Sequence, residues 1–394
     1  MLPPSIRSER VKRIEAILLS EVTMQGQWIG TYASTTNGDI LLDIDDHGAY
    51  FGGYAVLRPV DPQLPIVYAG IRTADKGDVA NFTVVPWAFD GLLNPQPWSI
   101  VQSSYPDVQF PDSAVVTLRI ENGTLFLNWT TNLGAGSAQI GPSHANLPST
   151  YVASTEVTDW NSFSHYVRTL SPYDSMFRGQ SNNAWRLRTS FHRTGRCDLL
   201  RYSLKDLPAA QKHLSAITRN IFTLSDPMQY GAFVSLIQHH GYPTPLMDWT
   251  HSPFVAAYFA YSAIKNKQAR AASEQEKVRI FMFSKTQWLN DQGQIIKLAP
   301  MYPHFSVLDA LAIENPRMIP QQGISSITNV DDVERYIDHI ERGTTKRYLQ
   351  VFDLPVVERP RVMRELAIMG VTAGSLFPGL DGACEELRER FFEA

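Results

Sequence analysis

The fold of the first part of the chain is decided by residues 28–44, which read WIGTYASTTNGDILLDI. Two runs rich in apolar and β-branched residues flank Asn37-Gly38, which is typical of a β-hairpin that turns at the Asn-Gly pair. The pattern recurs around Asn122-Gly123, between Ala114–Ile120 and Thr124–Trp129. We therefore expect an antiparallel β-barrel or sandwich of roughly 120 residues, a common size for such domains.

Working outward, the sequence predicts two domains that meet near residue 150. A chain of 394 residues is long enough for two domains of ordinary size. The first, 1–150, is expected to be all-β with a short N-terminal helix in front of it. The apolar side of that helix is formed by Val11, Ile14, Leu18 and Val22. The second domain, 151–394, is expected to be mixed α/β, which makes the whole chain α+β.

The second domain alternates helical and strand patterns. Apolar residues at helical spacing predict helices over 160–170, 209–222, 233–239, 252–265, 330–342 and 361–368. Short β-branched and aromatic runs predict strands over 175–178, 279–283, 323–327 and 347–352. We expect this domain to carry the chemistry.

Composition excludes several classes of protein. Hydrophobic residues make up 44% and charged residues 19% of the chain, so wholesale disorder is excluded. A net charge of −4 argues against a protein that binds duplex DNA through its overall electrostatic field. Cys197 and Cys384 are too few for a disulfide scaffold, and no apolar run reaches the roughly 18 residues that span a bilayer. We expect a cytoplasmic protein with no membrane partner.

An arginine beside a glycine is the first candidate for a binding site. Phe177-Arg178-Gly179-Gln180 places a planar guanidinium at the end of a predicted strand, where the glycine lets a ligand approach the backbone. A phosphate is the natural partner of such a guanidinium. The alternative is a structural ion pair at Arg178 and a simple turn at Gly179. On these four residues alone, that alternative is favoured.

The second candidate is residues 238–260, QHHGYPTPLMDWTHSPFVAAYFA. One helix is expected to end at Gly241, and another to begin with Pro253 in its first turn and Thr250 or Ser252 as its cap. The start of a helix gathers free N–H groups and hydroxyls, which suits a phosphate or a ribose. The alternative is a well-capped buried helix, and the two interpretations are compatible.

Residue spacing disfavours two other chemistries. His239, His240 and His251 do not follow a zinc-binding spacing such as His-Glu-x-x-His, so no metal is expected. Ser252, His240 and Asp248 offer the residue types of a hydrolase triad. However, no serine lies in a Gly-x-Ser-x-Gly motif, so hydrolase chemistry of this kind is disfavoured.

Two later blocks complete a pattern: Gln321-Gln322-Gly323, before a predicted strand, and LFPGLDG at 376–382, where Asp381-Gly382 predicts a tight turn. Together with FRGQ at 177–180 and the stretch 238–260, these blocks resemble the FRG domain family over about residues 157–390. FRG domains in turn resemble, more remotely, the ADP-ribosyltransferase superfamily. Its members bind NAD in a cleft of a split β core.

The remote resemblance implies a site for NAD as substrate. It implies that Arg178 contacts NAD, that the Gly179 backbone bonds the nicotinamide amide, and that Thr250 and Ser252 occupy the hydroxyl position of the second strand. Gln322 would take the third-strand position, which completes the catalytic set. The remaining residues expected to bind the cofactor are Phe177, Gln180, His240, Asp248 and Tyr258.

Gln322 departs from the superfamily, many of whose members carry glutamate at this position. Glutamine cannot act as a general base, so a proton would have to pass to the acceptor, to Glu314 or to Asp248, or no proton would be abstracted.

The resemblance implies an ADP-ribosyltransferase-like or NAD-cleaving effector, either a bacterial toxin or a phage-defence protein, with a protein or a nucleic acid as acceptor. Gln322 favours one alternative, a non-catalytic module that senses a nucleotide or binds a protein. The other alternative is a nucleic-acid-processing enzyme, favoured by Arg186, Arg188, Arg193 and Arg196.

The first domain is expected to be a regulatory or recognition module. Its carboxylate cluster at 43–46, with His47, is interpreted as solvated turn residues and not as a calcium loop, which would need further ligands. Exposed aromatics such as Trp87 or Trp98 are candidates for a recognition surface.

Overall fold

The computed structural model describes residues 23–91, 94–296, 298 and 302–392. They form two compact units. Unit 1 contains the chain up to Ser143 together with Gly195–Arg201, and unit 2 contains His144–Thr194 and the described chain from Tyr202 onward. The helix predicted over Val11–Val22 lies outside the described residues. Within the described ranges, no helix is both long and apolar enough to cross a membrane.

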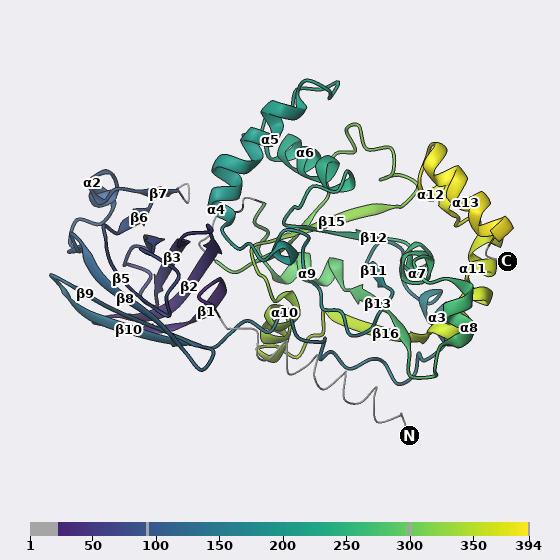
Figure 1. Cartoon of the computed structure of the whole chain (residues 1–394), viewed down its shortest axis with the longest axis horizontal. Helices are drawn as coiled ribbons and strands as arrows, with labels where there is room; N and C mark the ends of the chain where they lie inside the picture. Colours follow the sequence, from purple (N-terminus) through teal and green to yellow (C-terminus); the bar gives the residue numbers. More distant parts are fainter. Residues whose placement is uncertain (1–22, 92–93, 297, 299–301, 393–394) are drawn as a thin grey trace. The chain divides into compact units, whose positions relative to one another are not determined.

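Unit 1 is built on a ten-stranded antiparallel sheet that curls into a half-barrel (Figure 1). The strand order is β5-β8-β9-β10-β1-β2-β3-β4-β6-β7. The strands are β1 (Gly26–Ala33), β2 (Asn37–Asp46), β3 (Phe51–Pro59), β4 (Val67–Arg72), β5 (Val79–Val84), β6 (Trp87–Phe89), β7 (Pro95–Gln96), β8 (Ala114–Glu121), β9 (Thr124–Thr131) and β10 (Gly134–Ile140). Three short helices are α2 (Trp98–Val101), η1 (Gln102–Ser104) and, in the segment 195–201, α4 (Leu199–Arg201). The predicted antiparallel β fold is confirmed, in the form of one curled sheet.

Along β8, buried positions alternate with more exposed ones. In β8, Ala114, Val116 and Leu118 point into the core, whereas Val115 between them is 59% exposed. Successive side chains of a strand point to opposite faces, so one face of the sheet collects the apolar residues. The curl of the sheet encloses that face.

One predicted hairpin turn is correct and the other is wrong. Asn122 and Gly123 have φ of 50° and 77° and link β8 to β9 as expected. Asn37, by contrast, pairs with Ala33 inside the ladder, and the turn lies one step earlier, at residues 34–36. Gly38 is needed for a different reason, because a Cβ there would lie 2.0 Å from the carbonyl oxygen of Arg58.

The acidic cluster of unit 1 is buried, so its interpretation as solvated turn residues is wrong for two of its members. Asp43 and Asp45 are each only 1% exposed. The Asp45 carboxylate accepts hydrogen bonds from the backbone N–H groups of Cys197 (2.6 Å) and Asp198 (3.1 Å), and from Arg196 Nε (3.0 Å). It therefore fixes the segment 195–201 within unit 1, a long-range role that the local sequence does not reveal.

Asp198 gives unit 1 a predicted pH dependence. Burial, helped by the nearby Asp45 carboxylate, raises the pKa of Asp198 to about 6. A carboxyl group whose pKa is raised on folding stabilises the fold below its unfolded pKa of about 3.9, and loses that contribution as the pH rises through about 6. We expect Asp198→Asn, which keeps an acceptor for the Arg201 N–H (2.8 Å), to stabilise unit 1 by up to about 2 kcal/mol at pH 7.5 and not at pH 4. Thermal melts at the two pH values check this, and equal shifts at both would contradict it.

Unit 2 contains a six-stranded antiparallel sheet covered by helices (Figure 1). The strand order is β14-β15-β12-β11-β13-β16. The strands are β11 (Met176–Gln180), β12 (Leu246–Thr250), β13 (Lys277–Phe283), β14 (Phe305–Leu308), β15 (Gly323–Thr328) and β16 (Leu349–Pro355). The α-helices are α3 (Trp160–Val167), α5 (Leu207–Leu214), α6 (Pro227–His239), α7 (Pro253–Ser262), α8 (Asn266–Ala271), α9 (Lys285–Asp291), α10 (Val333–Arg342), α11 (Arg359–Ile368), α12 (Ala373–Leu376) and α13 (Leu380–Phe392). The remaining helical turns are η2 (His192–Thr194), η4 (Val356–Glu358) and a π-helix, η3 (Tyr202–Asp206). Mixed α/β structure is confirmed here, while an ADP-ribosyltransferase-like core remains a proposal.

Each face of this sheet packs against its own helices. Phe177 of β11 joins a core formed with α3, α7 and α11, whereas its neighbour Met176 joins a core on the other face with α9 and α10. Gly179 of β11 allows α7 to pack closely. A Cβ there would lie 1.9 Å from the carbonyl oxygen of Ala256 and 2.7 Å from the amide nitrogen of Ala260. The lack of a side chain at Gly179 therefore allows α7 to pack closely on the sheet.

The C-terminal blocks differ from the sequence prediction. Asp381-Gly382, predicted as a tight turn, lies within α13. Gly382 is required there because a Cβ would lie 2.0 Å from the carbonyl oxygen of Phe377.

The helix predicted over 209–222 ends at Leu214. Residues 246–250, which the residue pattern predicted as an extended crossing between helices, form the central strand β12.

Candidate functional site

The sheet of unit 2 opens between its two central strands. In the described chain, β11 and β12 pair at a single position, Phe177 with Thr250. Beyond this pair the strands diverge, so the backbone carbonyl of Asp248 faces β11 without a ladder partner. Arg178 Nη1 donates to that carbonyl oxygen at 2.6 Å. The divergence creates a concave opening lined by side chains of both strands.

A pocket of about 370 Å³ occupies this opening. It is lined by Phe177, Arg178, Gly179, Gln238, His239, Asp248, Trp249, Thr250, Ala256, Phe259, Arg317, Gln321 and Phe377. A neighbouring cavity of about 280 Å³ shares Arg178, Gln238 and Asp248, and it adds Arg188, Ser190, Arg193, Gly241, Tyr242, Leu246 and Met247. The two cavities meet at Arg178 and Asp248. Segments far apart in the sequence thus converge on one place.

Arg178 is held in the opening without a carboxylate partner among the described residues. Its Nη1 bonds a backbone carbonyl, while its buried Nε has no partner within the described ranges. Burial lowers the pKa of Arg178, with the Asp248 charge acting in the opposite direction. A guanidinium remains charged at neutral pH even so. The structural ion pair favoured from the four residues alone is not observed, so donor capacity remains for a ligand.

Asp248 and His239 form the second charged element of the pocket. His239 Nε2 lies 3.8 Å from Asp248 Oδ1, and Gln238 Nε2 donates to the same carboxylate oxygen at 2.5 Å. Burial acts to raise the pKa of Asp248, but His239 and Arg178 outweigh it and the net pKa is lowered. About half of the Asp248 side chain (53%) is exposed, toward the pocket. The pocket therefore presents an ionised carboxylate beside an arginine.

His239 is positioned from its other side. Its Nδ1 lies 2.8 Å from Asn315 Oδ1, which fixes the ring orientation. Burial acts to lower the pKa of His239, whereas the Asp248 carboxylate raises it, and the net pKa is raised. The imidazole is therefore poised to carry a proton next to Asp248.

The opposite wall combines a cation, an amide and an aromatic ring. Arg317 lies 5.5 Å from the ring centroid of Phe377 and donates to the His239 carbonyl oxygen at 3.5 Å. Gln321 Nε2 donates to the Leu376 carbonyl oxygen at 3.0 Å. An anionic group with a planar ring would find both kinds of contact in this pocket.

The predicted hydroxyl residues have structural roles. Thr250 lines the pocket, but its hydroxyl donates to the Gln321 carbonyl oxygen at 2.7 Å and accepts from the Ser252 N–H at 3.0 Å. Ser252 is the N-cap of α7, where its Oγ accepts from the Val255 N–H at 3.3 Å, and it does not line the pocket. The predicted cap at Ser252 is thus confirmed.

Gln322 does not line the pocket, and its neighbour Gln321 does. Residues 318–323 form a helical turn in which the Gly323 N–H donates to the Met318 carbonyl oxygen and the Gln322 N–H to that of Ile319. Gln322 takes the left-handed position of this motif, with φ of 47°. The fold therefore requires the positive φ of Gln322 and not its side-chain amide.

This reading of Gln322 gives a prediction. We expect Gln322→Gly to stabilise unit 2 by about 0.5–1 kcal/mol, because glycine adopts positive φ without a steric cost. Ligand binding should stay within twofold of the wild type, whereas Gln321→Ala should weaken it. Melting curves and ligand titrations on both variants test this. Loss of ligand binding in Gln322→Gly would contradict this and would support the third-strand position that the resemblance implies for Gln322.

The remaining predicted site residues lie elsewhere. Gln180 is buried at the far end of β11, His240 is exposed at the end of α6, and Tyr258 is buried in the α7 core. Glu314, one of the two proposed proton acceptors, accepts from the Asn220 N–H in an exposed loop. None of these four lines either cavity. Asp248 is the candidate acceptor that does.

Several pocket residues were not predicted: Gln238, His239, Trp249, Ala256, Phe259, Arg317, Gln321 and Phe377. The sequence marked Gln238 and His239 only as part of the stretch 238–260, in which a helix was expected to end at Gly241. Arg317 and Phe377 come from loops whose positions depend on tertiary packing. In the part of the chain that is described, no cluster of histidine, cysteine and acidic residues is arranged to hold a metal.

Comparison with known families matches residues 173–269 to the FRG domain model. This region carries an FRG domain. The match contains β11, α6, β12 and α7, which together supply Arg178, Gln238, His239 and Asp248. It is shorter than the predicted range of 157–390, and Arg317, Gln321 and Phe377 fall outside it. Neither a curated protein nor a solved structure matches the chain.

Proposed function

We propose that the FRG-containing unit 2 binds NAD or a related nucleotide in this pocket and transfers or hydrolyses its ADP-ribose. The observation that carries the proposal is the proximity of Arg178, whose buried Nε has no partner in the described chain, to the ionised Asp248, since both residues line two neighbouring cavities. Mixed polar and aromatic walls of this kind suit a ligand with both anionic and planar parts. The chain acts, in this proposal, as a toxin or phage-defence effector.

The second cavity supports a place for the pyrophosphate. Arg193 lines it together with Arg178, and Arg193 makes no ion pair with any described residue, its Nη1 donating to the Arg188 carbonyl oxygen at 3.0 Å. Two guanidiniums that make no ion pair with a described residue can bind a phosphate together. The first pocket, with Phe177, Phe259 and Phe377, then receives the nicotinamide half.

Cleavage of NAD between ribose and nicotinamide requires a negative charge near the ribose. Cleavage of the N-glycosidic bond moves the bonding electrons to the nicotinamide nitrogen and leaves an oxocarbenium-like ribose. A fixed negative charge stabilises such a centre. Asp248 supplies that charge, and it is also in a position to accept a proton from an attacking water or hydroxyl. In this proposal Asp248 takes over the function that glutamate performs in many ADP-ribosyltransferases.

The nucleic-acid-processing alternative loses its main support. Arg186 pairs with Asp332 at 2.6 Å and Arg188 with Asp331 at 2.5 Å, and both arginine side chains are largely buried. Arg196 is bonded to Asp45 in unit 1. Of the four arginines that favoured this alternative, only Arg193 has no carboxylate partner in the described chain.

The experiment is nicotinamide release. Purified full-length protein with NAD, alone and with cell lysate as acceptor source, should release nicotinamide, and Asp248→Asn should lower the rate at least about 100-fold, the usual effect of removing one general base. Glu314→Gln, away from the pocket, is the matched control and should leave the rate unchanged. Binding of NAD without release, by wild type and Asp248→Asn alike, would favour a non-catalytic nucleotide-sensing module. Growth after expression in bacteria tests the effector role separately.

A further inference from the structure

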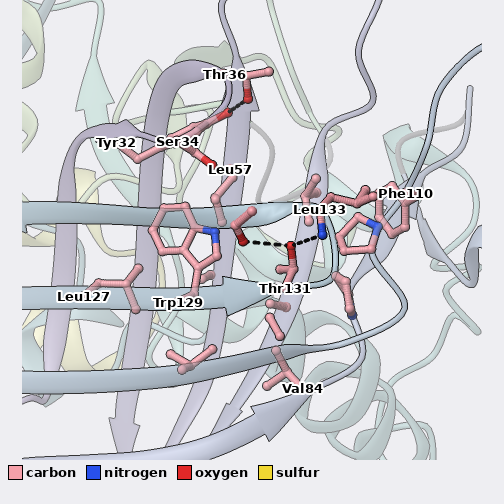
Figure 2. Close-up of a pocket in the computed structure, with 18 of the residues that line it drawn as sticks. Tyr32, Ser34, Thr36, Leu57, Val84, Phe110, Leu127, Trp129, Thr131 and Leu133 are labelled. Carbon is pink, nitrogen blue, oxygen red and sulfur yellow. Dashed lines mark hydrogen bonds between the residues drawn. The ribbon is translucent and has the colours of Figure 1, made fainter.

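The half-barrel of unit 1 encloses a cavity of about 200 Å³ on its concave face (Figure 2). The walls come from β1 to β5, β8 and β9 and from the loop before β8. Aliphatic residues such as Leu57, Val84, Val116 and Leu127 form most of the lining, and Trp129 contributes its ring. Within the described chain, none of the side chains that line the cavity is charged.

Size and polarity define what this cavity accepts. An engineered cavity of about 150 Å³ with a comparable apolar lining binds benzene. A volume of about 200 Å³ therefore fits a molecule the size of two fused rings or a short branched hydrocarbon. We infer that unit 1 is a receptor for an uncharged, largely apolar small molecule of this size that carries one hydrogen-bonding group.

One end of the cavity is polar and can bind the hydrogen-bonding group of the ligand. Tyr32, Ser34 and Thr36 lie together there, and the Tyr32 hydroxyl is 3.5 Å from Thr36 Oγ1, a contact at the outer limit of a hydrogen bond (Figure 2). Burial raises the pKa of Tyr32, so its hydroxyl remains an uncharged donor at neutral pH. A ligand hydroxyl or carbonyl is a better partner for this hydroxyl than Thr36 is.

Trp129 is fixed as a wall of the cavity. Its ring lies against Gly136 of β10, where a Cβ would come within 2.2 Å of the indole, and it makes an edge contact with Tyr32 at 5.9 Å between centroids. Thr131 and Leu133, at the end of β9, are held by a hydrogen bond from the Leu133 N–H to Thr131 Oγ1 at 3.0 Å (Figure 2). An aromatic side chain held in place in this way offers a preformed surface for stacking a flat ligand.

The test uses the full chain and two probes with the same ring system, 2-naphthol and 2-naphthalenesulfonate. Calorimetric titration should show binding of 2-naphthol with a negative heat-capacity change, the mark of apolar burial. The charged sulfonate should bind at least about tenfold more weakly, because no lining side chain compensates its charge. No heat with 2-naphthol, or equal affinity for both probes, would overturn the inference.

A matched pair of variants locates the site. Val116→Phe fills the cavity from β8, whereas Val115→Phe makes the same change on the exposed face of the same strand. We expect Val116→Phe to weaken 2-naphthol binding at least about tenfold. Val115→Phe should stay within twofold of the wild type. Should Val116→Phe fail to fold, Val84→Phe, at a less buried point of the lining, takes its place. Unchanged binding in the folded cavity variant would place the ligand elsewhere and overturn the proposal.

Discussion

Replacing Gly179 by alanine is expected to destabilise unit 2 by about 3 kcal/mol or more. The added methyl group would lie 1.9 Å from the Ala256 carbonyl oxygen and 2.7 Å from the Ala260 amide nitrogen, and both are backbone atoms of α7. Backbone inside a packed helix cannot rotate away as a side chain can, so β11 and α7 must separate. Overpacking of this severity lies at the upper end of measured effects.

The measurement is thermal or urea unfolding of the full chain. Gly293→Ala is the matched control, because a Cβ at Gly293 meets no atom within 4 Å. It should change the free energy of unfolding by less than about 0.5 kcal/mol, as is usual for exposed positions. A Gly179→Ala protein with a wild-type melting temperature would show that α7 does not pack as described.

Gly179 also shows what sequence reasoning can and cannot reach. The motif FRGQ marked Gly179 as a position where a ligand approaches the backbone, whereas the atoms that approach it closely in the structure belong to the protein itself. The partner in that approach is α7, whose sequence begins more than seventy residues later. A local pattern reveals that space is needed at a position, whereas what fills the space depends on the tertiary fold.

Local signals predicted the elements well where short-range physics decides them. The cap of α7 at Ser252 and the turn at Asn122-Gly123 both depend on neighbouring residues, and both are present. The residue pattern alone did not predict β12 as a strand, because two prolines precede it and its pairing partner β15 lies far along the chain. Long-range pairing overrides local propensity in such segments.

The candidate site was predicted in part for the same reason. Arg178 and Asp248 lie on the two central strands. Arg178 was selected as a guanidinium beside a glycine at a strand end, and Asp248 was selected through the family resemblance. Gln322 was selected for its residue type, but its positive φ gives it a turn role, and Gln321 lines the pocket. A one-residue difference at the start of a strand changes which side chain faces the opening.

The last prediction distinguishes a ligand-binding role of Arg178 from a structural role. Arg178→Ala should reduce nicotinamide release at least about 100-fold, because loss of two charged hydrogen bonds costs about 3 kcal/mol or more. Stability should change little, since the guanidinium has no carboxylate partner in the described chain, and the hydrogen bond that it makes there goes to the Asp248 carbonyl oxygen. The melting temperature should therefore fall by no more than about 4 °C, the shift expected for 1 kcal/mol in a unit of this size.

Two further variants sharpen the result. Arg178→Lys should fail almost as completely, because a point ammonium cannot replace the planar fork of donors. Arg168→Ala, which removes an exposed arginine at the end of α3, should behave as wild type. Melts with and without NAD complete the comparison: wild type and Arg168→Ala should be stabilised by NAD, and both Arg178 variants should not. A large loss of stability in ligand-free Arg178→Ala would instead assign Arg178 to the scaffold, and the NAD proposal would lose the residue on which it chiefly depends.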